Sequence, residues 1–273
     1  MRSLPAREAF FSLGALLLSV IIIQTIYATV IRPRAAAILA LPESRQRAPA
    51  NTGAGQAPAS RNLRSVFVIL KDYEQETALI LACWALALIA RQARATAQNR
   101  RLLQRDYVGV GEGYVLLPED ARAYARPLES LPPEEQDMLL PRALLVALNR
   151  FGATRSVQDS AEAVRAECEN ELDRLDAQLS MVRFTAWAIP AIGFVGTVRG
   201  IGRALQEAQR AVTGDITGVT LGLGVTFNST LTALVLCILV MFCLHQLQQA
   251  QDRLVLDTRT YVDRHLIRHM RVL

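Results

Sequence analysis

Apolar residues gather in four blocks along the chain instead of recurring with one helical or strand spacing. Phe10–Ile31 contains 22 residues without a charge, and Ile216–Leu244 contains 29. Both blocks exceed the roughly 20 apolar residues that span a hydrocarbon core. Two shorter blocks, Phe184–Val198 and Thr77–Ala90, contain 15 and 14 uncharged residues. The pattern predicts an all-α, polytopic membrane protein with about four transmembrane helices.

Polar stretches separate these blocks and predict the remaining segments. Residues 32–64 are rich in Ala, Pro, Gly and Ser, as linkers are. Residues 159–181 have the apolar spacing of an amphipathic helix, and Leu247, Leu254 and Tyr261 follow the last block at intervals of seven. We expect an N-terminal cytoplasmic segment over 1–9, transmembrane helices over 10–31, 69–90, 184–206 and 216–245, an extracytoplasmic linker over 32–68, a cytoplasmic helical region over 91–183, a short extracytoplasmic loop over 207–215 and a cytoplasmic helical tail over 246–273.

Arginines set the expected orientation. Those behind residue 90 and those in the last 21 residues favour a cytoplasmic middle region and a cytoplasmic C-terminus. Residues 32–64 hold six arginines and one acidic residue, Glu43, an unusual bias for an outside segment. A three-span alternative, in which Thr77–Ala90 does not cross, would place this segment inside. The first block could also be a signal peptide, although its apolar stretch is longer than usual and no convincing cleavage site follows.

The third block has one face that is almost free of side chains. At about 100° per residue, a set of small residues falls within an arc of about 100°, with Pro190 beside it and Arg199 on another side. Small residues allow close helix approach in lipid, so the face predicts helix packing. The set consists of Gly193, Gly196, Thr197, Gly200 and Ala204.

The fourth block has a similar face of about 80°. Its members are Gly218, Gly222, Thr226, Ser229 and Ala233, with Thr230 at the border and Asn228 on a second polar flank. Polar groups inside a membrane usually face a bundle interior or a water-filled path. The glycines of both blocks, together with Pro190, are therefore the predicted helix-packing positions. Neither block contains Asp, Glu, His or Lys. If ions cross here, hydroxyl groups and water line part of the path and a partner supplies the carboxylate.

Other functional classes find little support. The motifs of nucleotide-binding loops, zinc proteases and serine hydrolases are absent from the sequence, so we expect no enzyme and no cofactor. His265 and His269 are spaced like helical metal ligands but lie in a basic tail, where solvated helix surface is the better explanation. The net charge of +5 is explained by arginines that meet anionic membrane lipid, without any nucleic acid.

Two stretches together resemble the MotA/TolQ/ExbB proton-channel family. They are "AIPAIGFVGTVRGIG" and "GVTLGLGVTFNSTLTALVLCILVMFCLHQLQQAQDRLVLD", and the likeness covers about residues 181–262. The resemblance implies a pentamer around the single transmembrane helices of two partner chains similar to MotB, TolR or ExbD, each with a transmembrane aspartate. It also implies a multi-pass protein of the bacterial inner membrane.

The same resemblance also implies which residues line the pore. The pore-facing threonines of the family fall at Thr197 and Thr230, and Thr226, Asn228 and Ser229 complete the predicted pore-lining set. Asn228 stands where related sequences often have Asp, and the glutamate of ExbB-type members is missing near Val225. From the resemblance we expect the transported ion to be a proton, and these two departures leave sodium as the alternative.

Two functions follow from these features. The first is a channel-forming stator subunit of an ion-driven membrane motor, which transmits rotation or force through the partner. The alternative is a non-conducting membrane scaffold that uses its small-residue faces only for oligomer packing.

Overall fold

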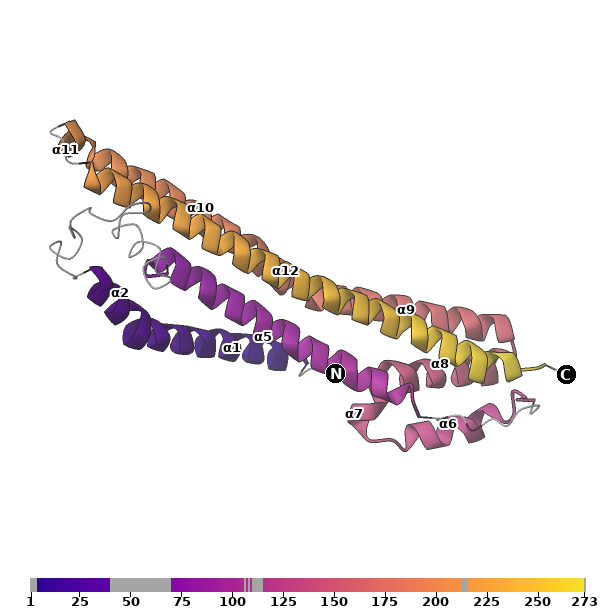
Figure 1. Ribbon diagram of the computed structural model, residues 1–273. Helices are drawn as coiled ribbons and strands as arrows, with labels where there is room; N and C mark the ends of the chain where they lie inside the picture. The colour runs from indigo at the N-terminus through magenta and orange to yellow at the C-terminus, as the bar shows by residue number, and fades with distance from the viewer. Residues whose placement is uncertain are drawn as a thin grey trace, which may run out of the picture. The chain divides into compact units, whose positions relative to one another are not determined.

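The computed structural model describes residues 4–39, 70–105, 107, 109, 115–212 and 216–272, and these are almost entirely helical (Figure 1). Its elements are α1 (Leu4–Ile26), the π-helical η1 (Tyr27–Ile31), α2 (Arg32–Leu39), α5 (Tyr73–Leu102), α6 (Ala121–Glu129), α7 (Pro133–Gln136), α8 (Leu139–Thr154), α9 (Val157–Gln178), α10 (Ser180–Gln206), α11 (Ala208–Val212), α12 (Thr217–His265) and η3 (Ile267–His269). The described residues contain one isolated β-bridge, between Leu116 and Met270. The predicted all-α class is confirmed.

Four helical stretches are long and apolar enough to cross a membrane: Phe10–Ala37, Tyr73–Leu102, Val157–Gln206 and Gly218–His269. The prediction of four long apolar helices is therefore confirmed. Of the predicted linker, residues 32–39 form α2, and residues 40–68 lie outside the described residues. Residues 213–215 of the predicted short loop also lie outside them. The segment boundaries and the orientation stay predictions.

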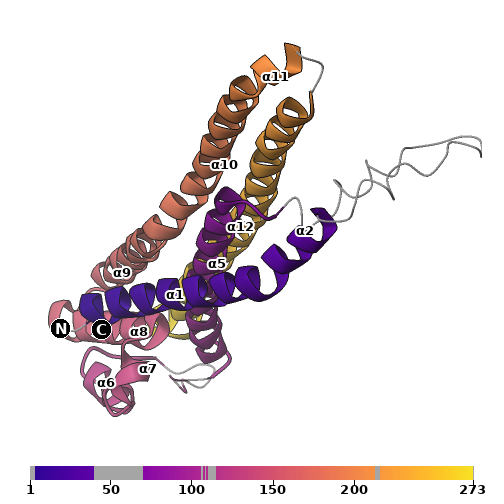
Figure 2. The same ribbon diagram turned by 90° about the vertical axis from the view of Figure 1, so that its left-hand side faces the viewer.

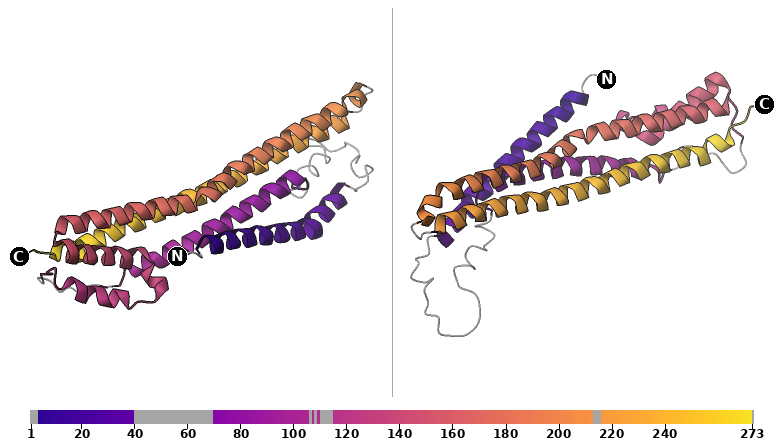
Figure 3. Two further views of the ribbon diagram at one scale, coloured as in Figure 1. Left: turned by 180° about the vertical axis from the view of Figure 1, so that it is seen from behind. Right: turned by 90° about the horizontal axis from the view of Figure 1, so that it is seen from above.

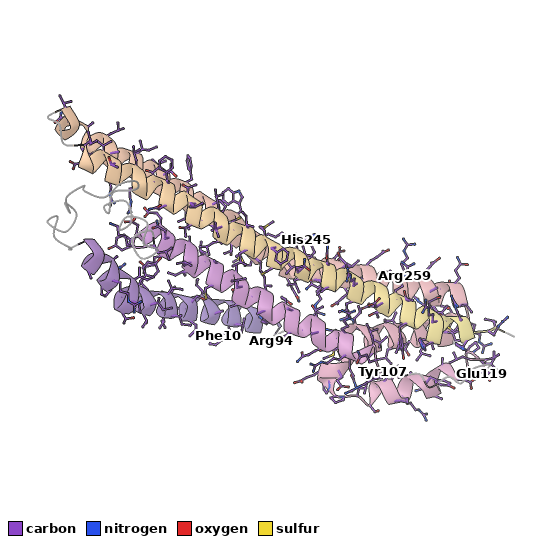
Figure 4. All side chains as sticks on the ribbon, viewed as in Figure 1. Phe10, Arg94, Tyr107, Glu119, His245 and Arg259 are labelled. Carbon is purple, nitrogen blue, oxygen red and sulfur yellow. The ribbon has the colours of Figure 1, made fainter. Side chains whose placement is uncertain are left out.

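The chain divides into two compact units, and each has its own pattern of burial. Unit 1 contains Met1–Leu88 and Val182–Cys243. Its buried positions are often small, as at Ala78, Ala82 and Ala85, whereas large apolar side chains point outward. Phe10 is 81% exposed and projects from α1 (Figure 4). Large apolar residues outside and small residues inside are what a bundle surrounded by lipid requires.

Unit 2 contains Ile89–Met181 and Leu244–Leu273, and it has the opposite pattern. Its core consists of large apolar side chains, among them Leu144, Phe151, Val262 and Leu266, each fully buried. The amphipathic helix expected over 159–181 is present as α9, and the expected helical tail is the continuous end of α12. A core of large side chains covered by charged surface is typical of a helical domain in water.

The connection between α8 and α9 is a sharp reversal. Arg155 follows α8 with a left-handed backbone (φ 52°) and donates its backbone N–H to the Phe151 carbonyl. Ser156 then caps α9 by accepting a hydrogen bond from the Asp159 backbone N–H at 3.2 Å. The two caps satisfy helix-end groups that would otherwise lack partners.

A charged clamp fastens α8 to α9. Arg142 on α8 donates from Nε to Glu167 at 2.5 Å and from Nη2 to Glu171 at 2.6 Å. Its side chain is 27% exposed, and those of Glu167 and Glu171 are 21% and 13% exposed. Because one guanidinium group bonds two poorly solvated carboxylates, its loss would leave Glu167 without this cation and Glu171 with only its longer ion pair to Arg174, at 3.7 Å.

We expect Arg142→Ala to lower the free energy of unfolding of unit 2 by about 2–3 kcal/mol, because both carboxylates stay poorly solvated. The measurement is chemical unfolding of the full chain, followed by circular dichroism. Arg165→Ala is the matched control, since its ion pair with Glu169 is solvent-exposed on both sides and contributes little. Equal losses of unfolding free energy in Arg142→Ala and Arg165→Ala would contradict the role of this charged clamp.

Candidate functional site

The small-residue faces of α10 and α12 lie against each other in unit 1. The two helices run side by side in opposite chain directions (Figure 3). A side chain at most of the glycines would collide with the other helix. The contacts pair Gly193 with Ala233, Gly196 with Ser229, Gly200 with Thr226, Gly222 with Ala204 and Gly218 with Glu207. Four of the five predicted packing glycines thus lie at the contact between α10 and α12, and Gly218 lies against Glu207, the residue that follows α10.

The two backbones approach most closely at Gly200 and Gly222, and a Cβ atom on Gly200 would lie 2.9 Å from the Gly222 carbonyl oxygen. A Cβ atom on Gly222 would lie 2.9 Å from the backbone nitrogen of Ala204 and 3.0 Å from its Cα atom. Backbone atoms cannot move aside as a flexible side chain can, so only glycine fits this position. Gly193 is nearly as restricted, because a Cβ atom would meet the Ala233 Cβ at 2.5 Å.

Two predicted pore threonines meet at this contact. The Thr197 and Thr230 hydroxyl groups are hydrogen-bonded to each other across the two helices. The Gly193 carbonyl lies 3.2 Å from each of the two hydroxyl oxygens and can accept from either. Both side chains are partly exposed. The pair therefore lies at the border of the contact, where the two helices do not fully enclose it.

The other predicted pore residues lie differently. Thr226 and Ser229 are 4% and 1% exposed and point into the helix contact. Thr226 donates to the Gly222 carbonyl at 3.1 Å, and Ser229 donates to the Thr226 carbonyl at 3.0 Å. Asn228 is partly exposed and lies two residues from Thr230, on a different side of α12. The structure thus brings Thr197 and Thr230 together and separates Asn228 from them.

Pro190 changes the backbone of α10 at one turn. A proline has no N–H to donate, so the carbonyl four residues earlier, that of Ala186, loses its usual helical partner. The Cys237 thiol of α12 donates to this carbonyl, with 3.4 Å between sulfur and oxygen. An unsatisfied backbone carbonyl is costly inside a membrane, so the thiol supplies what the proline removes. The proximity of Cys237 to this turn of α10 depends on how the two helices pack, so it could not be predicted from the sequence.

The ion pair of charged residues next to this contact was not predicted from the sequence. Glu74 at the start of α5 accepts a hydrogen bond from Arg199 Nη2 of α10 at 2.7 Å. The available signal was Arg199 itself, because an arginine within a span needs an anionic partner. Among the described residues, no group of three or more His, Cys, Asp or Glu side chains could hold a metal ion.

Comparison with known proteins agrees with this architecture. The model of the MotA/TolQ/ExbB proton channel family matches residues 135–260, which include the helix contact and much of unit 2. The chain therefore carries a domain of this family, whose proteins are membrane channels and not enzymes. No curated protein and no solved structure matches the chain.

We expect Cys237→Ala to lower the stability of unit 1 by up to about 1 kcal/mol, because the Ala186 carbonyl then has no donor. The cost should shrink in a Pro190→Ala background, where residue 190 again donates its own N–H to that carbonyl. The measurement is thermal unfolding of the four variants of this cycle in detergent. Cys243→Ala is the matched control, since no bond of its thiol is observed in the described part of the chain. If Cys237→Ala lowers the thermal stability equally in the native chain and in the Pro190→Ala background, the thiol does not compensate for the proline.

Proposed function

Because the chain carries a MotA/TolQ/ExbB proton channel family domain, we propose that it is the channel-forming stator subunit of an ion-driven membrane motor. Family membership implies the channel and stator role in general terms. The proposal adds that this chain lines the ion path with hydroxyl groups and transmits force through a single-span partner.

The Thr197–Thr230 pair carries this proposal. The two hydroxyl groups come from different helices, meet at the edge of the small-residue contact and stay partly exposed. Each has lone pairs that can accept from a hydrated ion or from a protonated partner group. Their mutual hydrogen bond and the Gly193 carbonyl fix their positions before any ion arrives. Such preorganised oxygens are suited to replacing part of an ion's water shell.

The carboxylate on the path comes from the partner. Phe184–Val198 and Ile216–Leu244 contain no Asp, Glu, His or Lys, so neither of these stretches supplies a carboxylate. A partner similar to MotB, TolR or ExbD, with one aspartate in its single span, would place that group beside the hydroxyl pair. Proton transfer to and from this aspartate would then be the step coupled to motion, and sodium is the alternative ion.

The proposed assembly is a homopentamer around two copies of the partner helix, in the bacterial inner membrane. Support for a cytoplasmic C-terminus comes from the arginines of the tail, Arg253, Arg259, Arg264, Arg268 and Arg271. Arg259 is exposed on α12 in unit 2 (Figure 4).

A second candidate is the non-conducting scaffold. One observation favours it: Thr226 and Ser229 are buried in the contact between α10 and α12, where they serve packing. This candidate predicts that the hydroxyl groups of Thr197 and Thr230 are dispensable, whereas the glycines at the contact are required for assembly.

We expect Thr197→Val and Thr230→Val each to lower ion flux through the complex with its partner by about tenfold to a hundredfold, with assembly retained. Loss of a hydrogen bond to a charged group costs roughly 1.5–3 kcal/mol, which corresponds to this change in rate. The measurement is ion flux into vesicles that contain the purified complex.

Thr220→Val is the matched control, because Thr220 is exposed and bonds its own helix at the Ile216 carbonyl. Gly196→Leu should disrupt assembly under either candidate function, since a side chain there meets Ser229. Undiminished ion flux in both Thr197→Val and Thr230→Val would reject the proposed role of these hydroxyl groups in the channel. The scaffold would then be the better candidate function.

A further inference from the structure

A cavity of about 300 Å³ lies between α9 and the part of α12 that belongs to unit 2. Figure 2 shows α8 beside α9, where Arg142 joins the two helices, and the cavity lies where α9 faces α12 instead. Pockets that bind small ligands have volumes of roughly 300–1,000 Å³, so this cavity is near the lower limit. It can hold one amino-acid side chain or a molecule of that size.

Three leucines form the apolar wall of this cavity. Leu172, Leu175 and Leu179 stand three or four positions apart at the end of α9, which places them on one face of the helix. Leu179 is 1% exposed, whereas Leu172 is 37% exposed. The wall therefore extends from the core of unit 2 to the solvent, and it suits an alkyl chain that leaves water by lying along it.

The cavity also carries negative charge. Asp176 of α9 and Asp252 of α12 line it, and none of the described residues around it is Lys or Arg. No ion pair or hydrogen bond of the Asp252 side chain is observed in the part of the chain that the structure describes. A group that binds here should therefore be a cation. Because no three His, Cys, Asp or Glu side chains among the described residues could hold a metal ion, an organic cation fits better.

A buried amide at the same cavity has an unused donor. Gln251 lines the cavity and is 3% exposed, and its Nε2 atom has no hydrogen-bond partner among the described residues. Buried polar atoms are nearly always satisfied, so this N–H group needs an acceptor. Gln249 differs, because its Nε2 atom lies 3.1 Å from Nε2 of His245, which is labelled in Figure 4. An ammonium group cannot accept from Gln251, whereas a carbonyl oxygen can.

We propose that this cavity binds a lysine residue. Its ammonium group lies at the two aspartates, its alkyl chain lies along the leucines, and its carbonyl oxygen accepts from Gln251 Nε2. A lysine side chain buries its methylene groups on apolar surface and keeps its ammonium group in water. The three donors of an ammonium group can turn toward separate carboxylates, whereas the planar guanidinium group of arginine suits the fork of a single carboxylate.

The same chemistry occurs in two sources, a lysine of a protein segment and a free lysine-like amine with a carbonyl group. The site stands on the geometry of unit 2 and does not rest on the proposed channel function.

Binding of Nα-acetyl-lysine N-methylamide to the full chain in phospholipid nanodiscs tests the site. This probe has the ammonium group, the alkyl chain and the carbonyl groups of a lysine residue, without charged ends. The measurement is saturation-transfer NMR, which detects weak ligands through magnetisation passed from protein methyl groups to the probe. The matched control probe carries an acetyl group on its side-chain nitrogen and has no charge. We expect it to bind about tenfold more weakly.

Two substitutions separate the charged part of the site from the amide. Asp252→Asn should weaken binding of the lysine probe about threefold, because one exposed carboxylate loses its charge. Asp257→Asn is its matched control, since Asp257 is exposed on α12 and does not line the cavity. Gln251→Met removes the unused donor with little change of length. It should weaken binding of the lysine probe about threefold to tenfold and leave binding of n-butylamine, which has no carbonyl, unchanged.

Absence of probe binding, or binding that Asp252→Asn and Gln251→Met leave unchanged, would overturn the proposal. Circular dichroism checks that both variants fold. If Gln251→Met does not fold, equal affinities of the native chain for the lysine probe and n-butylamine overturn it instead.

The same titration of the complex with the proposed partner distinguishes the two sources. Loss of probe binding in the complex assigns the lysine to the partner chain, and retained binding assigns the site to a free molecule. Failure of the site leaves the channel proposal intact, because that proposal is tested by ion flux in the threonine variants. Undiminished flux in those variants, in turn, does not affect the lysine site.

Discussion

The close contact of α10 with α12 is the constraint on which the candidate site depends. At Gly222 the two backbones approach so closely that no side chain fits between them. That approach brings the Thr197 and Thr230 hydroxyl groups within hydrogen-bonding distance and the Cys237 thiol within reach of the Ala186 carbonyl. A wider separation would lose both interactions together, because each requires the two backbones to be nearly in contact.

Much of this arrangement could be predicted from sequence, for physical reasons. Lipid requires long uncharged helices, so the four apolar stretches were recognisable by length and composition. Close packing in lipid requires small residues at helical spacing, so Gly193, Gly196 and Gly222 identified the contacting faces. The threonine pair followed from the resemblance together with those faces.

Contacts between distant segments could not be predicted in this way. Glu74 and Arg199 are 125 positions apart, and the sequence alone does not tell which of the acidic residues meets that arginine. The bond from Cys237 to the Ala186 carbonyl depends on the register of α12 against α10, to within a fraction of a helical turn. Thr226 and Ser229 show the same limit, because their burial depends on which part of the polar face meets the neighbouring helix.

The thiol bond at Pro190 has a mechanical consequence. Because α10 lacks one of its own backbone hydrogen bonds there, its resistance to bending at that turn depends on an atom of α12. Rotation of α12 about its axis would withdraw the sulfur from the Ala186 carbonyl and soften α10 at this turn. Turning of one helix would thus be coupled to bending of its neighbour, without any change of charge at either position.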